Sequence, residues 1–341
     1  MDESCDALDN GLVSQIDRRR FLKRVGGIAG LALLGLHPDA TVSAAKRAGS
    51  NPFTLGVASG DPLTDQDGNA SVVLWTRLAP KPLEVGGGMP DETVSVEWQV
   101  AEDESFTLGL KQGTASAGPD FAHSVHVVVD GLRPASVYYY RFIYSAYVSP
   151  AGRTKTAPTP GADVALLSFA FASCQRWDEG FYYAYRHMKD QDLDLVVHLG
   201  DYIYENDMPA DGGVRRTRVP SACRPEPITL DQYRLRYALY KTDPDLQAAH
   251  ARFPWIVTWD DHEVENDYAS DYPEGASEPD PSFRNRRANA YKAYYEHMPV
   301  RMGPDTRLYR RLTYGNLAEF NVLDTRQYRS NQMCGDGESA P

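Results

Sequence analysis

Cysteine is scarce in this sequence, with four residues in a chain of 341. So few cysteines exclude a small scaffold held together by many disulfide bridges. Cys5 lies in the N-terminal segment described below, which leaves three. Cys223 and Cys334 both lie in loop-like surroundings and could pair, in which case Cys174 is a free thiol.

Positive charge is also in short supply. The chain has 35 Lys and Arg residues against 47 Asp and Glu residues, which gives a formal net charge of −12. Binding to a nucleic-acid backbone needs a basic surface, so the composition predicts no nucleic-acid-binding surface. A small phosphorylated partner stays possible, because a multivalent metal ion attracts phosphate locally whatever the net charge of the chain.

The sequence predicts no stable membrane span. The apolar stretch at residues 25–36 is rich in glycine and too short to cross a bilayer. A basic cluster at residues 18–24 precedes it, and small residues at 43–45 follow. This order predicts a signal peptide over residues 1–45, and Arg18-Arg19 resembles the start of a twin-arginine signal. We therefore expect export by the twin-arginine pathway to a periplasmic or extracellular location.

Residues 50–157 have the pattern of an all-β domain. Short segments rich in Val, Tyr and Trp are separated by Gly, Pro and Asp, and several alternate apolar with polar residues. We expect an immunoglobulin- or fibronectin-like sandwich with strands near residues 71–78, 94–101, 123–132 and 136–144. Residues 158–163, which contain Pro, Thr and Gly, are a plausible linker.

From residue 164 to residue 341 the pattern changes to α/β. The apolar runs at 165–174 and 193–201 end abruptly in polar residues, as buried parallel strands do. Helical patterns are present at residues 180–190, 229–241 and 282–298. Ligands bind at the carboxyl ends of the strands in such domains. Three polar clusters occupy those ends, at residues 173–175, 200–205 and 260–263.

The first two clusters contain candidate metal ligands. Asp201 follows a glycine at a strand end, and Tyr204 is one helical turn further on. Cys174, as a thiolate, would add a third anionic donor. Other interpretations are open at this point, because Asp201 could cap a helix and Cys174 could be a small buried apolar residue.

The third cluster lies in the sequence TWDDHEVENDY at residues 258–268. Asp261 could bind a second metal ion, and His262 could contact a phosphoryl oxygen or protonate a leaving group. The alternative is a solvated acidic loop, which is our interpretation of residues 265–267.

Four ordered motifs resemble the PhoD-type alkaline phosphatases of the calcineurin-like metallophosphatase superfamily: FASCQ, GDYIYE, TWDDHEVEND and VLDTRQYR. The resemblance covers nearly all of residues 52–335. It implies an α/β metallophosphatase domain, a β sandwich flanked by helices, at residues 164–341. It also implies an exported phosphatase or phosphodiesterase in which metal-activated hydroxide attacks a small phosphate ester.

The resemblance further implies Fe³⁺ and Ca²⁺ as cofactors. Cys174 and Tyr204 would bind the ferric ion, and Asp201 would bridge it to calcium. Asp261 would bind the second metal, with Asp260 as the alternative, and His262 would face the phosphate. Glu263 is expected to support these ligands without binding metal.

The chain lacks two histidine motifs that close the site in the superfamily, since the last histidine is His297 in YYEHMPVR. We expect His297 to cap a helix or pack in the core. The sequence therefore predicts a C-terminally truncated phosphatase. The alternative function is a catalytically inactive relative that acts as a binding or adhesion module. Nothing in the sequence indicates an oligomeric state.

Overall fold

The structure is a computed structural model that describes residues 50–301 and 306–331. The expected signal peptide at residues 1–45 lies outside these residues, and so does Cys334, so the pairing of Cys334 with Cys223 stays a prediction. Cys223 itself is buried. Among the described residues, no helix combines the length and the apolar character needed to cross a membrane.

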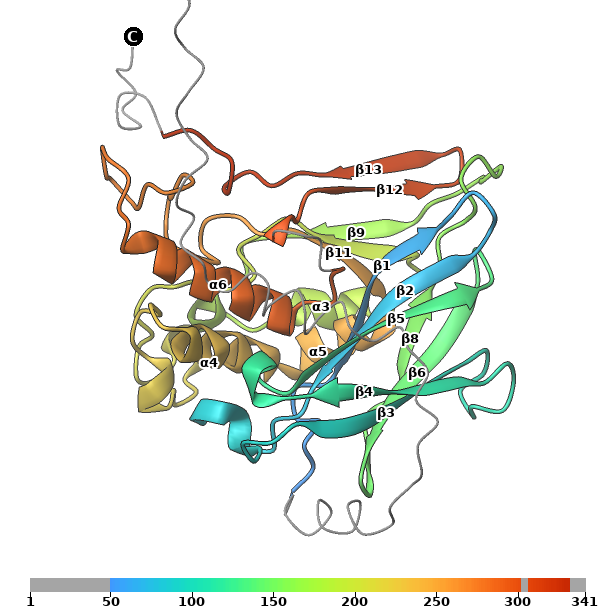
Figure 1. Ribbon diagram of the computed structural model, residues 1–341, viewed down its shortest axis with the longest axis horizontal. Coiled ribbons are helices and arrows are strands. Elements are labelled where there is room, and N and C mark those ends of the chain that lie inside the picture. Colours follow the sequence, from blue (N-terminus) through green and yellow to red (C-terminus); the bar gives the residue numbers. More distant parts are fainter. Residues whose placement is uncertain (1–49, 302–305, 332–341) are drawn as a thin grey trace, which may run out of the picture. The chain divides into compact units, whose positions relative to one another are not determined.

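The central element is a six-stranded sheet in the order β5-β2-β1-β11-β10-β9 (Figure 1). Three antiparallel strands come from the N-terminal half: β1 (Val57–Thr64), β2 (Ala70–Arg77) and β5 (Ser124–Leu132). Three parallel strands come from the C-terminal half: β9 (Phe169–Ala172), β10 (Leu195–His198) and β11 (Pro254–Val257).

A second sheet contains only strands of the N-terminal half, in the order β4-β3-β6-β7, with β8 paired to β6. These strands are β3 (Val94–Ala101), β4 (Lys111–Ala117), β6 (Val137–Tyr144), β7 (Tyr147–Val148) and β8 (Gly152–Lys155). Val72 and Leu74 of the first sheet share one buried core with Val96 and Phe142 of the second. The two sheets therefore pack face to face across an apolar layer.

The first sheet differs from the expected separation of an N-terminal sandwich from an α/β domain. β1 pairs in parallel with β11, with Ser59 opposite Pro254 and Gly60 opposite Trp255. Gly60 permits this close approach, because a Cβ at this position would lie 2.7 Å from the carbonyl oxygen of Trp255 in β11. Strands on either side of residues 158–163 thus belong to one continuous sheet.

Four α-helices are found in the described part of the chain: α3 (Tyr183–Met188), α4 (Leu230–Lys241), α5 (Pro244–Arg252) and α6 (Phe283–His297). α4 begins with a capping box in which Thr229 and Gln232 each accept from the other's backbone N–H. α4 packs against α6, and α5 packs against β1. Short 3₁₀ turns are present at Val85–Gly88, Pro119–Phe121, Trp177–Glu179, Gly213–Arg215 and Ser221–Cys223.

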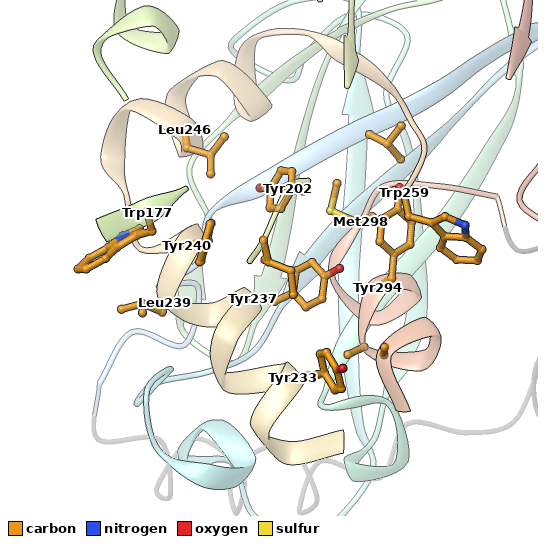
Figure 2. Close-up of a cluster of buried hydrophobic side chains, with 14 of the residues drawn as sticks. Trp177, Tyr202, Tyr233, Tyr237, Leu239, Tyr240, Leu246, Trp259, Tyr294 and Met298 are labelled. Atoms are coloured by element: carbon orange, nitrogen blue, oxygen red, sulfur yellow. The ribbon is translucent and has the colours of Figure 1, made fainter. Parts of the chain in front are cut away.

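The helices and the parallel strands enclose a core that is unusually rich in aromatic rings (Figure 2). Tyr237 and Tyr294 meet edge to face with their ring centroids 6.3 Å apart, and Trp259 stacks on Tyr291 at 4.2 Å. Large flat side chains of this kind bury much apolar area and have few rotamers to lose. This core includes Tyr202 and Trp259, which follow the ends of β10 and β11.

A two-stranded hairpin lies beside β9, formed by β12 (Arg310–Tyr314) and β13 (Ala318–Val322) (Figure 1). The rings of Phe169 and Phe320 touch, with centroids 5.7 Å apart. Contrary to the expectation of a buried strand at residues 165–174, Phe169 is 46% exposed and Phe171 is 69% exposed. The reason is topological, because β9 is the last strand of its sheet.

Candidate metal centre

The ends of β9, β10 and β11 bring the three predicted polar clusters together. These strands are parallel neighbours, so their carboxyl ends meet at one edge of the sheet. The loops after β9 and β10 are joined directly, since the Cys174 N–H donates to the Gly200 carbonyl at 3.3 Å and the Gln175 N–H donates to the Asp201 carbonyl at 3.1 Å.

The backbone at this edge is unusual. Cys174 and Asp201 both have a φ of +56°, in the left-handed region that residues with a Cβ rarely adopt. Gly200 has a φ of +113°, and a Cβ there would lie 2.6 Å from the backbone nitrogen of Asp260. Backbone strain of this kind concentrates at functional sites, where the surrounding structure holds it in place.

Asp201 is the centre of the cluster. The Tyr204 hydroxyl donates to its Oδ2 at 3.1 Å, and the Cys174 Sγ lies 3.4 Å from the same oxygen. Asp201 also forms a group with Asp260 and Asp261 in which one ligand oxygen from each residue lies within 4.8 Å of the others. The Asp201 carboxylate therefore contacts the thiol of Cys174 and the phenol of Tyr204, and it also lies close to the carboxylates of Asp260 and Asp261.

The structure excludes the competing interpretations of Asp201 and Cys174. No helix begins after Asp201 in the described chain, so its side chain does not cap one. Cys174 is exposed and is not a buried apolar residue. Tyr204 reaches Asp201 although residues 201–204 form no helical turn, in contrast to the expectation from their spacing.

These side chains fit a multivalent cation. Asp201 Oδ1 is buried and has no hydrogen-bond partner among the described residues, which is costly for a carboxylate unless a cation compensates. Burial raises the pKa of Asp201. The negative charges of Asp261 and Asp260 raise it further, while the charge of His262 lowers it. Partial desolvation likewise raises the pKa of Tyr204 and of the Cys174 thiol, although Cys174 is exposed overall. A bound cation would reverse these shifts, because it favours the anionic form of each ligand.

Glu263 joins the loops that carry the three aspartates by hydrogen bonds to their backbone. It is almost fully buried, and its carboxylate accepts the backbone N–H groups of Asp201 at 3.1 Å, Tyr202 at 2.5 Å and Asp260 at 2.8 Å. Burial raises its pKa to about 8, and the charge of Asp201 adds to this. Glu263 thus faces the backbone of the loops that carry Asp201 and Asp260, and its role in supporting metal ligands stays a prediction.

His262 is held in one orientation by two neighbours. Its Nδ1 lies 2.7 Å from Glu205 Oε2, and its ring stacks on Tyr204 with centroids 4.1 Å apart. Burial lowers the pKa of His262, but the hydrogen bond and the charge of Glu205 outweigh it and raise the pKa to about 9. In the metal-free protein Glu205 therefore favours the protonated ring, whose Nδ1–H donates to this carboxylate.

Sequence reasoning missed two residues of this site, Glu205 and Arg326. Arg326 binds Asp260 Oδ1 through Nε at 2.5 Å and Asp261 Oδ1 through Nη2 at 3.0 Å. Glu205 lies in the motif GDYIYE and Arg326 lies in the motif VLDTRQYR, but the sequence of these motifs does not indicate the direction of either side chain. The interpretation of residues 265–267 as a solvated loop is also incomplete, since the Asn266 and Asp267 N–H groups donate to Glu205 and Asp261.

His297 is not part of the site. It is fully buried at the end of α6, where its Nδ1 lies 2.7 Å from the Ala293 carbonyl and its ring stacks on Tyr237. It therefore packs in the core, one of the two roles expected for it.

Comparison with known proteins agrees with this architecture. Residues 169–341 match the PhoD-like phosphatase domain, and residues 39–158 match the N-terminal domain of PhoD-like phosphatases. The chain is 55% identical over 338 residues to alkaline phosphatase D of Bacillus subtilis (strain 168), a match that covers 95% of this chain and 56% of that protein. A solved structure of PhoD superposes with a TM-score of 0.78 at 57% identity, and the match covers 85% of this chain and 55% of the other.

The chain thus spans about half the length of the relatives that it matches. The family matches follow the order found in the sequence, with the all-β region first and the strand-end clusters second. More than half of the residues are identical to those of a curated relative over almost the whole chain. The chain belongs to the PhoD-like phosphatase family.

Proposed function

We propose that this chain carries the catalytic centre of an exported, metal-dependent alkaline phosphatase or phosphodiesterase that hydrolyses small phosphate esters. The observation that carries the proposal is the position of Asp201, which touches Cys174 and Tyr204 on one side and lies within 4.8 Å of Asp260 and Asp261 on the other. Family membership supports the reaction class. The basic, apolar and small-residue segments at 18–45 support export.

Each half of the cluster suits a different ion. A thiolate and a phenolate beside a shared carboxylate suit Fe³⁺, and we assign Cys174, Asp201 and Tyr204 to it. Carboxylate oxygens suit the hard cation Ca²⁺, to which we assign Asp201 and Asp261, with Asp260 as the alternative to Asp261. When bound, the ions supply positive charge that activates water and stabilises the charge developing on the phosphoryl group.

His262 is proposed as the proton donor to the phosphate. Glu205 accepts from Nδ1 and so fixes the plane of the imidazole, while the stacked Tyr204 ring limits its rotation. No side chain of the described residues hydrogen-bonds to Nε2. That nitrogen is then free to donate to a phosphoryl oxygen or to the leaving group.

The test is hydrolysis of p-nitrophenyl phosphate and bis-p-nitrophenyl phosphate by the purified chain at alkaline pH, before and after removal of metal with a chelator. We expect metal-dependent hydrolysis that Asp201→Asn abolishes together with metal binding. His262→Gln keeps the metal and lowers kcat by about 10²–10⁴, the usual contribution of a general acid. Asp67→Asn is the control, because Asp67 is exposed in the β1–β2 turn.

Two results would contradict the proposal. Hydrolysis that survives both the chelator and Asp201→Asn would place the reaction elsewhere. Absence of both metal and hydrolysis in the unaltered chain would leave the alternative, a catalytically inactive binding module. A visible absorption band in the natively purified protein would indicate a ferric ion bound by phenolate or thiolate, and its loss in Tyr204→Phe would identify the phenolate.

A further inference from the structure

Arg326 places a positive charge inside the acidic cluster. Its side chain is 10% exposed, and its guanidinium forms ion pairs with both Asp260 and Asp261. A third carboxylate, Asp267, lies 3.9 Å from Nη1. Nη1 is buried and has no hydrogen-bond partner among the described residues, so this nitrogen is held by charge alone.

The guanidinium uses the same oxygen atoms that a metal ion would use. Arg326 contacts Oδ1 of Asp260 and Oδ1 of Asp261, while the other oxygen of Asp261 accepts the Asp267 N–H at 2.8 Å. Neither oxygen of Asp261 is therefore without a donor. A cation that approaches Asp260 and Asp261 meets another cation already bound to them.

Without a metal ion, the cluster needs this charge. Asp201, Asp260 and Asp261 bring three carboxylates within 4.8 Å of one another, and two of the three are buried. Like charges at this separation repel strongly when they are shielded from water. Arg326 pairs with two of the three, so it lowers the repulsion in the metal-free protein.

We propose that Arg326 is a positioning residue that stands in for metal charge: it holds Asp260 and Asp261 together in the metal-free protein and competes with a bound cation for them. The inference rests on the proposed function, because it requires that this cluster binds a metal ion. It assigns Arg326 no contact with the substrate. Its consequence is that the same ion pairs stabilise the metal-free fold and weaken metal binding.

The test compares Arg326→Gln, Arg326→Lys and the unaltered chain, with Ca²⁺ alone as the probe. Arg329→Gln is the matched control, because it removes the same charge from an exposed position three residues away. For each protein the thermal midpoint is measured without metal, and the Ca²⁺ affinity is measured by calorimetry. Neither readout depends on phosphatase activity.

We expect Arg326→Gln to lower the metal-free midpoint by several degrees and to tighten Ca²⁺ binding about tenfold, a typical coupling between two ligands of one site. Arg326→Lys keeps the positive charge but loses the planar guanidinium that can bind two carboxylates at once. Because the charge remains, its Ca²⁺ affinity stays within about threefold of that of the unaltered chain. Arg329→Gln changes neither quantity. If metal-free Arg326→Gln is unfolded, saturating Ca²⁺ should restore its near-UV circular dichroism.

Weaker or unchanged Ca²⁺ binding in Arg326→Gln overturns the inference, because a residue that only shapes the loop would lower the affinity when removed. Failure of Ca²⁺ to restore an unfolded Arg326→Gln overturns it too. These results leave the proposed function intact if the unaltered chain binds metal. If neither the unaltered chain nor Arg326→Gln binds Ca²⁺, both proposals fail. Binding by Arg326→Gln alone supports competition by Arg326.

Discussion

Lys241, the last residue of α4, is a charged group in an aromatic environment. Only 2% of the residue is exposed, and its Nζ lies 4.3 Å from the ring centroid of Trp75 and 5.2 Å from that of Tyr202. The ring faces attract the ammonium group but replace water incompletely. Burial accordingly lowers the pKa of Lys241 to about 7.

This burial predicts a pH-dependent stability. In the unfolded chain Lys241 titrates at its ordinary value of 10.5, so between pH 7 and 10.5 the unfolded state binds more protons than the folded state. Stability rises with pH across this window and is lost as the pH falls through it. Below pH 7 the cost of burying the charge is constant. Each unit of pKa difference between the folded and unfolded states corresponds to about 1.4 kcal/mol of unfolding free energy.

Lys241→Met should therefore stabilise the protein by a few kcal/mol at pH 7 and by much less near pH 10. Urea unfolding of the variant and of the unaltered chain at the two pH values measures this difference. Lys81→Met is the control, because the Lys81 side chain is 62% exposed and its charge stays in contact with water. A gain that is as large at pH 10 as at pH 7 would contradict the buried-charge explanation.

At the scale of elements, the parallel strands position the site through their ends. β10 ends at His198, β11 ends at Val257, and the loops that follow are in van der Waals contact at Gly200 and Asp260. Glu263 then ties both loops together through three backbone N–H groups. The spacing of Asp201 from Asp260 thus depends on a contact that leaves no room for a side chain at residue 200.

Gly200→Ala tests this contact. The methyl group would lie 2.6 Å from the Asp260 backbone at a φ of +113°, so one of the loops has to move. We expect a loss of about 3 kcal/mol in unfolding free energy and weaker metal binding. Gly161→Ala is the matched control: it has a φ of +81° and no atom within 4 Å of the new Cβ, so only about 1 kcal/mol is lost. If the two variants lose the same unfolding free energy, backbone strain alone explains why residue 200 is a glycine, and the contact with Asp260 does not.

At the scale of the whole described chain, residues far apart in the sequence are joined by a buried ion pair. Asp61, at the bulge of β1, accepts from the guanidinium of Arg310 in β12 and from the Arg301 backbone N–H at 2.8 Å. Asp61 is fully buried. Together with the β1–β11 pairing, this ion pair attaches the N-terminal strands to the C-terminal hairpin.

Removal of one partner should be costly. Asp61→Ala leaves the Arg310 charge without its carboxylate, and we expect a loss of about 3–5 kcal/mol in unfolding free energy. The double variant Asp61→Ala/Arg310→Met removes both charges and should recover much of that loss. Chemical denaturation of the unaltered chain, Asp61→Ala, Arg310→Met and the double variant measures the coupling. If the double variant loses the sum of the two single losses, the ion pair does not join the two regions.

The sequence determined most of the local structure. Helices predicted at 229–241 and 282–298 are observed at Leu230–Lys241 and Phe283–His297, and strands predicted at 94–101 and 136–144 are observed at Val94–Ala101 and Val137–Tyr144. Periodicity and turn residues act over a few positions and can therefore be read directly. The order of the motifs likewise identified the family, because each motif is a continuous stretch of chain.

Tertiary structure alone decided which strands pair and which side chains meet. No local pattern could place β1 beside β11 or leave Phe171 exposed, because both depend on the position of a strand in its sheet. Arg326 is 65 residues from Asp261 in sequence, and its charge acts on the cluster only because the chain returns to the ends of β10 and β11. Spacing along the chain predicts candidate ligands, but the folded structure sets the charge around them.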